Sequence, residues 1–395
     1  MRLPVFSYES TYTTGNDPVY VFGSLLRQKQ FTTSDFALDK LNSPDARGNF
    51  SNALQMQVPL FTGFRISDYK RLGDNATRQA DASAGYARQG VAMEVMSKYF
   101  MSAFKGRLAV IAHSAADSIS ADLAVAQRLK DKGLVLGSDY YAAQSTLNSV
   151  KSAGAALAQD ALASAESLGV LTAGQVPTDS AAMPQLAKYV YNITSADALA
   201  ARSAARGDIT VAELAAVSAR IAKDMESNTV LPQVGAFARL QTDTNNFNVN
   251  PLRSMVGVGV SVPFGDFTRA DRIARRSAEL KSADESARQL RRTAAAQLAE
   301  YRRNYESARA ALPLAEQAIK DAEQSLELFR PLFRQGRQSV LDVVRTEYAL
   351  MSARSYYEEQ IFKLHSYHAA ILFVSGALDD GAVSHISDAV GGAVK

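Results

Sequence analysis

The chain lacks cysteine altogether, which excludes disulfide bonds, thiolate metal sites and cysteine nucleophiles. It also lacks a dominant charge, because 43 basic residues face 40 acidic ones and leave a net charge of +3. A nucleic acid or another polyanionic partner is therefore not implied. No run of about 18 apolar residues occurs, so we expect no transmembrane helix. Residues 1–5 do not begin the apolar core of a signal peptide, which taken alone favours a cytoplasmic protein.

What the chain has is a long internal repeat. The stretches DKGLVLGSDYYAAQSTL, residues 131–147, and RQGRQSVLDVVRTEYAL, residues 334–350, place a glycine, an aspartate and a leucine at the same spacing. Three further pairs of segments match, and they keep the same order in both copies: residues 3–5 with 231–233, 58–59 with 262–263, and 168–171 with 375–378. Two long copies indicate internal pseudosymmetry, because a solenoid needs three or more repeats.

Each copy is expected to open with two strands. Apolar and polar residues alternate over 3–13 and 51–61 in the first copy, and over 231–242 and 252–263 in the second. Such alternation gives every strand one apolar and one polar face. Strands of about 10 residues suit a tilted membrane-spanning strand, although an ordinary half-buried sheet explains the same pattern. The sequence of the insertion at 13–50 indicates no particular role.

Long helices are expected to follow the strands. Helix-forming residues fill 66–130 and 138–168 in the first copy, and 268–333 and 339–375 in the second. From Ile273 to Phe329 a small or apolar residue recurs with the heptad period, which predicts a helix that supercoils against its neighbours.

The repeats and the elements together give a domain division. We expect a first copy at 1–171, a linker at 172–195, a second copy at 196–378 and a flexible tail at 379–395. The second copy includes a leading helix at 196–229, whereas the first copy has no counterpart of it.

Over residues 3–378 the sequence resembles the TolC-like outer-membrane efflux proteins. The resemblance rests on the LP-type strand entry, the VP-type exit into a long helix, and the glycine–aspartate turn, each of which occurs twice in order. It implies an α+β membrane protein built from two repeats of a β-hairpin and a long helical hairpin. It also implies a homotrimer, in which a 12-stranded β-barrel in outer-membrane lipid continues as a periplasmic α-helical tunnel.

Several functions remain open at this point. The resemblance implies the outer-membrane channel of a tripartite efflux pump, a passive exit duct for small molecules that works with a periplasmic adaptor protein and an inner-membrane transporter. A duct for type I protein secretion is the alternative within the family. A soluble long-helix scaffold is the alternative of another class, and it is favoured by the lack of a signal peptide at Met1. The missing signal peptide and first helix also raise the expectation that the reading frame starts upstream or that the chain is a fragment.

A duct requires no catalytic group or cofactor, and we predict neither, nor any metal site. His365 and His368 share one helical face, but no acidic partner nearby completes a metal site. The resemblance places the adaptor-docking tips at Gly133, Leu134, Val135, Gly336, Arg337, Gln338 and Ser339.

The tunnel constriction is expected at Asp342, Arg345 and Asp139. In the related proteins an aspartate ring sits where this chain has Asp342. Our hypothesis is that an arginine, Arg345, Arg334 or Arg337, pairs with one of the two aspartates and holds the tip shut. The simpler alternative is that both aspartates only cap the returning helices.

Overall fold

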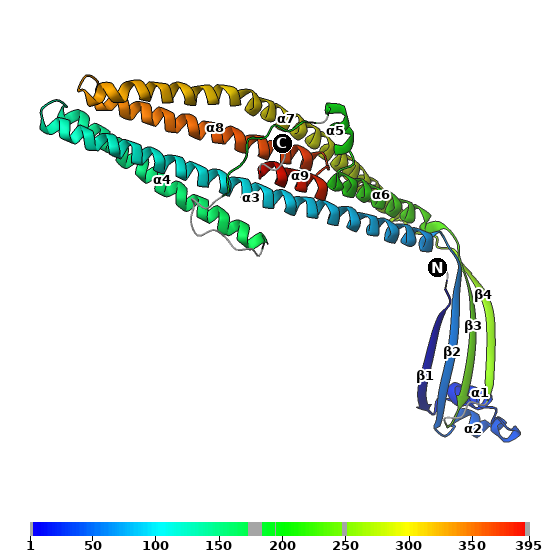
Figure 1. Cartoon of the computed structure of the whole chain (residues 1–395). Coiled ribbons are helices and arrows are strands. Elements are labelled where there is room, and N and C mark those ends of the chain that lie inside the picture. The colour runs from blue at the N-terminus through cyan, green and yellow to red at the C-terminus, as the bar shows by residue number, and fades with distance from the viewer. Residues whose placement is uncertain (1–2, 173–183, 194, 247–250, 392–395) are drawn as a thin grey trace. The chain divides into compact units, whose positions relative to one another are not determined.

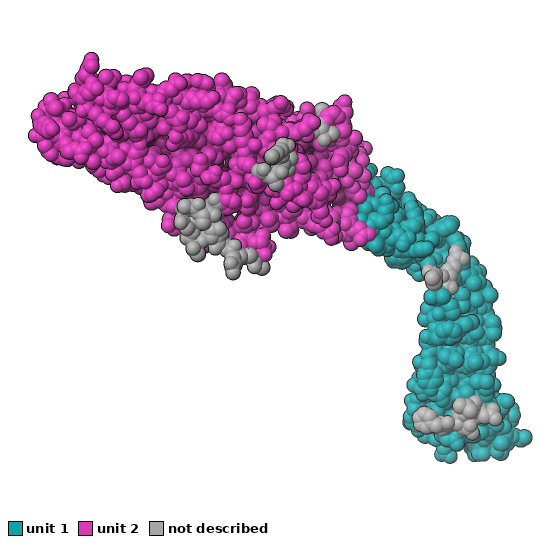
Figure 2. Space-filling model, in the orientation of Figure 1, with its two compact units in different colours: residues 1–78, 214–284 teal, residues 79–213, 285–395 magenta. Residues whose placement is uncertain are grey.

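The structure is a computed structural model of the chain, and it describes residues 3–172, 184–193, 195–246 and 251–391. These residues form two compact units, which Figure 2 colours separately. Unit 1 comprises residues 1–78 and 214–284, and unit 2 comprises residues 79–213 and 285–395. Each unit takes segments from both copies of the repeat, so the compact units do not follow the copy boundaries.

Unit 1 is built on one antiparallel sheet with the order β1-β2-β3-β4 (Figure 1). Its strands are β1 (Val5–Gly15), β2 (Arg47–Thr62), β3 (Gln233–Thr244) and β4 (Leu252–Ser261). Each lies within a few residues of an expected strand. Pairing between β2 and β3 joins the hairpin of the first copy to that of the second.

The insertion after β1 has secondary structure of its own. It contains α1 (Pro18–Arg27), the 3-10 helix η1 (Thr33–Phe36) and α2 (Leu38–Asn42). Asp17 caps α1 by accepting a hydrogen bond from the Tyr20 amide at 2.8 Å. The insertion joins the end of β1 to the start of β2, so it lies at the opposite end of the sheet from the strand ends that lead into the long helices.

Four long helices dominate the rest of the chain: α3 (Arg65–Asp131), α4 (Gly137–Thr172), α7 (Arg269–Arg334) and α8 (Val340–Val374). In unit 2 all four contribute to one hydrophobic core near the glycine turns. Every position of the heptad stripe from Ile273 to Phe329 is buried or half-buried, as the pattern predicts. Among the described helices, α3 alone contains a window apolar enough to cross a membrane, a test that core helices also pass.

Two expectations for the remaining segments need correction. The leading helix expected over 196–229 is divided into α5 (Ala196–Ser203), α6 (Gly207–Ser227) and the 3-10 helix η3 (Asn228–Val230). The division falls beside Gly207, where an added Cβ would lie 2.8 Å from the Cβ of Tyr86. A side chain there would collide with α3, so the chain needs glycine at this close approach.

The tail expected to be flexible at 379–395 instead contains α9 (Asp380–Val390). Asp379 caps this helix by accepting from the Ala382 amide at 2.9 Å. Ile386, Ala389 and Val390 are buried in the hydrophobic core of unit 2. Their helical spacing forms one apolar stripe, which fixes the helix on the core. Residues 392–395 of the expected tail, and 173–183 and 194 of the expected linker, lie outside the described residues.

Candidate functional site

The sheet has two chemically different faces, because residues paired across neighbouring strands lie on the same side. The strand register places Gln55 between Ser7 and Arg239. It places the preceding residue, Leu54, between Tyr8 and Leu240. We call the first side the polar face; its residues include Asn49, Ser51, Gln55, Gln57, Arg239, Gln241, Asp243 and Arg253. The other side is the apolar face; its residues include Phe6, Tyr8, Tyr12, Leu54, Met56, Leu240, Val256 and Val258.

The apolar face is open to the surroundings. Val256 is 79% exposed, Tyr8 69% and Phe6 63%. Within unit 1, the described residues leave these side chains uncovered. An exposed apolar surface of this extent marks contact with a membrane or a partner.

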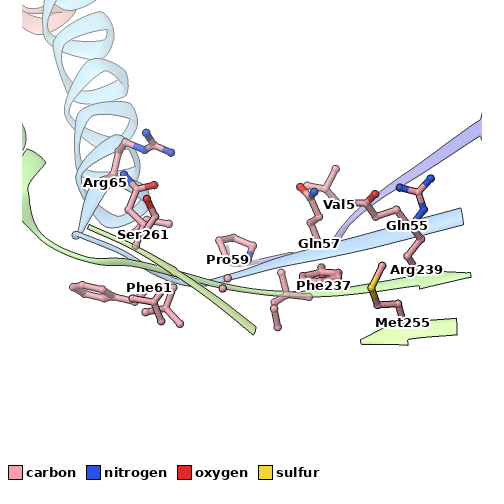
Figure 3. A pocket seen from close by; sticks show the side chains of 18 residues that line it. Val5, Gln55, Gln57, Pro59, Phe61, Arg65, Phe237, Arg239, Met255 and Ser261 are labelled. Atoms are coloured by element: carbon pink, nitrogen blue, oxygen red, sulfur yellow. The ribbon is translucent and has the colours of Figure 1, made fainter. Parts of the chain in front are cut away.

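The polar face lines a hollow of about 690 Å³ (Figure 3). Figure 3 shows Gln55, Gln57 and Arg239 rising from the same side of the sheet. The ring of Phe237 lies across Gly257, where an added Cβ would approach the ring within 2.8 Å. A glycine is therefore required beneath the ring. Next to the hollow, the register between β2 and β3 shifts between Pro59 and Phe61, consistent with the confinement of proline to bulges and strand edges.

The two glycine turns of unit 2 have the same geometry. Gly133 and Gly336 have φ angles of 75° and 70°, a region that favours glycine. The Gly133 amide donates to the Lys130 carbonyl at 2.8 Å, and the Leu134 amide donates to the Leu129 carbonyl at 2.9 Å. The Gly336 and Arg337 amides repeat both bonds at the second turn, which ends α7 as the first turn ends α3. Each is a Schellman helix end.

The expected docking residues lie at these turns. Leu134 is 60% exposed, whereas Val135 is half-buried against the core near the turns. Gly133, Gly336 and Arg337 are exposed, and Gln338 and Ser339 are half-buried. The tips therefore combine exposed polar and apolar surface at the ends of helices that share one hydrophobic core.

One hydrogen bond links the two turns. Ser339 Oγ donates to Asp139 Oδ2 at 3.1 Å. Ser339 is also the N-cap of α8, and its hydroxyl accepts from the Leu341 amide at 3.1 Å. Asp139 lies in the first turn of α4. The capping of α8 thus falls to Ser339, and Asp139 joins the two hairpins.

Asp342 lies three residues inside α8, where its charge complements the helix dipole. Its carboxylate accepts a hydrogen bond from the Gln338 side chain and lies 4.0 Å from Arg345 Nη1. The Arg345 side chain is 77% exposed. The structure thus brings Arg345 to Asp342, while Asp139 is bonded to Ser339 in place of the arginine of the hypothesis.

A buried polar cluster between α3, α7 and α8 was missed by sequence reasoning. Arg330 Nε lies 3.3 Å from Asp122 Oδ2, and Arg330 also pairs with Glu347. Ser118 Oγ donates to Glu347 Oε1 at 2.5 Å. Glu347 and Asp122 are each 4% exposed. The available signal was that Glu347 stands on the apolar stripe of α8, between Val344 and Leu350.

The histidines belong to a second buried cluster. Tyr191 Oη lies 2.6 Å from His365 Nδ1, and His365 Nε2 lies 2.9 Å from the Ala187 carbonyl oxygen. Because a carbonyl only accepts, Nε2 carries the proton and Nδ1 accepts from tyrosine. The ring of His368 stacks on that of Tyr191 with centroids 3.8 Å apart. These contacts fix residues 184–193, which we call the strap, on α8.

Burial governs the titration of this cluster. It lowers the pKa of His365, and it lowers the pKa of His368 to about 3 with help from the neighbouring His385 and His365. Both rings are therefore neutral at pH 7. In the described part of the chain no group of three or more His, Cys, Asp or Glu residues could hold a metal ion.

The family model and the solved structures that match this chain describe the same type of protein. Residues 197–360 match the family described as outer membrane efflux protein. No curated protein sequence matches the chain. The outer membrane protein VceC of Vibrio cholerae shares 16% identity with a TM-score of 0.79, over 95% of this chain and 87% of that one.

Two further solved channels give similar figures. The Campylobacter jejuni CmeC outer membrane channel shares 13% identity with a TM-score of 0.77, over 100% of this chain and 83% of that one. The open-state Neisseria gonorrhoeae MtrE outer membrane channel shares 15% identity with a TM-score of 0.72, over 96% and 82%. The fold of this chain is therefore the fold of these channels.

Proposed function

We propose that this chain, whose residues 197–360 match the outer membrane efflux protein family and whose fold is that of solved outer membrane channels, is the outer-membrane exit duct of a tripartite efflux pump. Three copies would form a β-barrel in the outer membrane and a helical tunnel in the periplasm. A periplasmic adaptor and an inner-membrane transporter would deliver small molecules to the tunnel, and the duct itself would be passive.

The observation that carries the proposal is the exposed apolar face with a polar face behind it. Lipid would cover Phe6, Tyr8, Val256 and Val258, and water in the lumen would solvate the polar face. The strands contain 10 to 16 residues, enough for tilted strands to cross the hydrocarbon core, which needs about 9–11.

Closure of the barrel accounts for the homotrimer. The four-stranded order leaves the outer edges of β1 and β4 without a partner strand in this sheet. Unpaired backbone groups in lipid cost several kcal/mol each, so open edges are not tolerated there. If β4 of one copy pairs with β1 of the next, three copies supply about twelve strands, within the range of outer-membrane barrels.

The tips are the proposed contact with the adaptor, through Gly133, Leu134, Val135, Gly336, Arg337, Gln338 and Ser339. The exposure of Leu134 and Arg337 and the identical helix ends at the two turns support this assignment. The proposed constriction consists of Asp342, Arg345 and Asp139. Three copies of Asp342 around the axis would favour cations at the throat, because rings of carboxylates select for cations.

The chain, fused to a generic export signal and produced in a Gram-negative host, tests the proposal. We expect a detergent-extracted trimer in the outer-membrane fraction that forms ion-conducting channels in planar bilayers. A soluble monomer that keeps its helical content would contradict the duct and favour the scaffold alternative.

A further inference from the structure

The insertion between β1 and β2 folds onto one specific side of the sheet. Gln28, at the C-terminal end of α1, donates from Nε2 to Asn49 Oδ1 at 2.9 Å and to the Gly48 carbonyl oxygen at 2.9 Å. Asn49 belongs to the polar face. Arg253, another polar-face residue, donates from Nη1 to the Arg27 carbonyl at 2.6 Å. Helix α1 therefore covers the polar face at the end of the sheet remote from the long helices.

The contact is centred on a buried aspartate. Asp243 is 0% exposed, and its carboxylate accepts from Asn49 Nδ2 at 2.9 Å and from Gln241 Nε2 at 2.9 Å. Arg253 forms an ion pair with the same carboxylate. Each oxygen of Asp243 is thus bonded, as a buried charge requires. Because Arg253 bonds both Asp243 and the end of α1, the aspartate holds the helix through one intermediate residue.

The insertion also has a small core that keeps it folded. Val21 and Ser24 on α1 are buried. The rings of Phe22 and Phe31 lie 4.8 Å apart between centroids, and those of Phe31 and Phe36 lie 5.1 Å apart. A hydrogen bond from Tyr20 Oη to the Thr13 carbonyl, 2.7 Å long, ties α1 to the end of β1. The segment is therefore a structured element fixed against the sheet.

The polar face changes character along its length. At the remote end, where α1 contacts the sheet, Gln28 is 4% exposed and Asn49 is 6% exposed. At the end nearer the long helices, Gln57 is exposed beside the open hollow of Figure 3. One end of the face is thus covered by the chain itself, and the other end is open.

We propose that residues 16–46 form an inward-folded plug that narrows the outer mouth of the duct, and that Asp243 and Arg253 latch it to the lumen wall. The inference rests on the proposed function, because it takes the polar face as the lumen wall. Three such plugs, one from each copy, would make the outer mouth a size-selective exit for the transported molecules. A solute leaving the duct would then pass the insertion helices last.

The absence of cysteine allows a direct measurement of access. Gln57→Cys places one thiol on the open part of the polar face, below the plug. A bulky, membrane-impermeant maleimide added to whole cells reaches this thiol through the outer mouth. Asn245→Cys is the reference thiol. It lies at an exposed position in the connection after β3, and the maleimide can reach it without passing the plug.

Two variants remove the plug in different ways. Residues 16–46 can be replaced by Asn-Gly, because Gly15 pairs with Arg47 and a two-residue turn closes such a hairpin. Asp243→Ala keeps the insertion but removes the latch, which covers the case in which the shortened chain does not fold. Glu9→Ala, which removes a charge from the polar face outside the latch, is the matched control.

We expect the labelling rate of Gln57→Cys to rise several-fold in both plug variants and to stay unchanged with Glu9→Ala. Equal rates with and without the plug, in chains that reach the outer membrane, would overturn the plug alone. If Gln57→Cys stays unlabelled even in the two plug variants while Asn245→Cys is labelled, the polar face is not the lumen wall, and both the plug and the proposed duct are wrong.

Discussion

Ser339 Oγ donates a 3.1 Å hydrogen bond to Asp139 Oδ2, and this bond joins the turn between α7 and α8 to the turn between α3 and α4. Asp139 lies in the first turn of α4, and Ser339 is the N-cap of α8. We predict that Asp139→Ala loosens the tips and raises the open probability of single channels in planar bilayers. The helix end itself should stay intact, because the cap of α8 is supplied by Ser339.

The matched variant is Ser339→Ala, which removes both the link and the cap. Loss of a serine cap costs about 1 kcal/mol, so this variant should also lower the free energy of unfolding. Ser339→Thr keeps both bonds and should behave as the native chain. If Asp139→Ala leaves the open probability at its native value, the link does not hold the tips together.

The second prediction concerns Asp342 and Arg345. Their 4.0 Å contact is largely exposed, so it should contribute only about 0–1 kcal/mol to stability. We therefore expect Asp342→Ala and Arg345→Ala to unfold almost as the native chain does. Their effect should appear in conduction: loss of Asp342 lowers the preference for cations, and loss of Arg345 raises it.

Reversal potentials under a salt gradient measure this preference. Arg309→Ala is the control, since Arg309 and Glu306 form an exposed pair with the same helical spacing, but in the middle of α7. Unchanged conductance and selectivity in both tip variants would remove Asp342 and Arg345 from the constriction.

The third prediction concerns the buried Arg330 cluster. Glu347→Gln keeps the shape of the side chain but removes one of the two carboxylates that face Arg330. Because Glu347 is buried and Arg330 is about one-third exposed, we expect a loss of about 1–3 kcal/mol in the free energy of unfolding. Denaturant unfolding of unit 2, followed by helical content in detergent, measures it.

Glu323→Gln is the comparison for this cluster. Glu323 and Arg354 also join α7 to α8, at 2.7 Å, but both side chains are at least 40% exposed. Loss of this ion pair should lower the free energy of unfolding by less than about 1 kcal/mol. Equal losses in the two variants would mean that the buried cluster contributes no more than a surface pair.

Local patterns were enough to predict the sheet faces and the hairpin turns. A period of two settles which side each strand residue occupies, and Leu54 and Gln55 accordingly lie on opposite faces. Gly133 and Gly336 were recognisable because the left-handed helix end favours glycine. The Asp139–Ser339 bond was not predictable, because the two residues are far apart in the sequence and meet only once both hairpins pack.

Other features depended on contacts that no local pattern encodes. The break before Gly207 follows from the proximity of Tyr86, which is distant in the sequence. The α1 helix in the insertion carries capping and apolar signals, but its position over Asp243 depends on the sheet beneath it. The helix in the tail after Leu378 was not predicted. Its apolar residues Ile386, Ala389 and Val390 form a buried face only once the segment is helical.

The fourth prediction is a pH dependence of strap docking. The pKa of His368 is about 6.5 in the unfolded chain, and burial lowers it to about 3 in the folded chain. The unfolded state therefore binds more protons below about pH 6.5, so the free energy of unfolding falls as the pH drops from there towards about 3. The contribution is fully present above about pH 6.5. The slope is at most about 1.4 kcal/mol per pH unit for each buried histidine.

Limited proteolysis of residues 184–193 at about pH 7 and about pH 5.5 would follow the release of the strap. His368→Phe is the matched variant, since it keeps a ring stacked on Tyr191 and removes one protonation site. Its cleavage rate should depend less on pH than that of the native chain. If the two chains respond to acid equally, His368 does not control docking.

The last prediction compares two neighbours on β2. Leu54 lies on the apolar face and is 46% exposed, and Gln55 lies on the polar face. If lipid covers the apolar face, Leu54→Arg places a charge in hydrocarbon and should cost about 2–4 kcal/mol near the middle of the membrane. If water in the lumen solvates the polar face, Gln55→Arg would place the same charge in water beside Arg239, where repulsion is weak. The yield of trimer in the outer membrane should fall for Leu54→Arg alone. Equal yields would mean that lipid does not cover the apolar face, and the reverse order would exchange the lipid and lumen sides of the sheet.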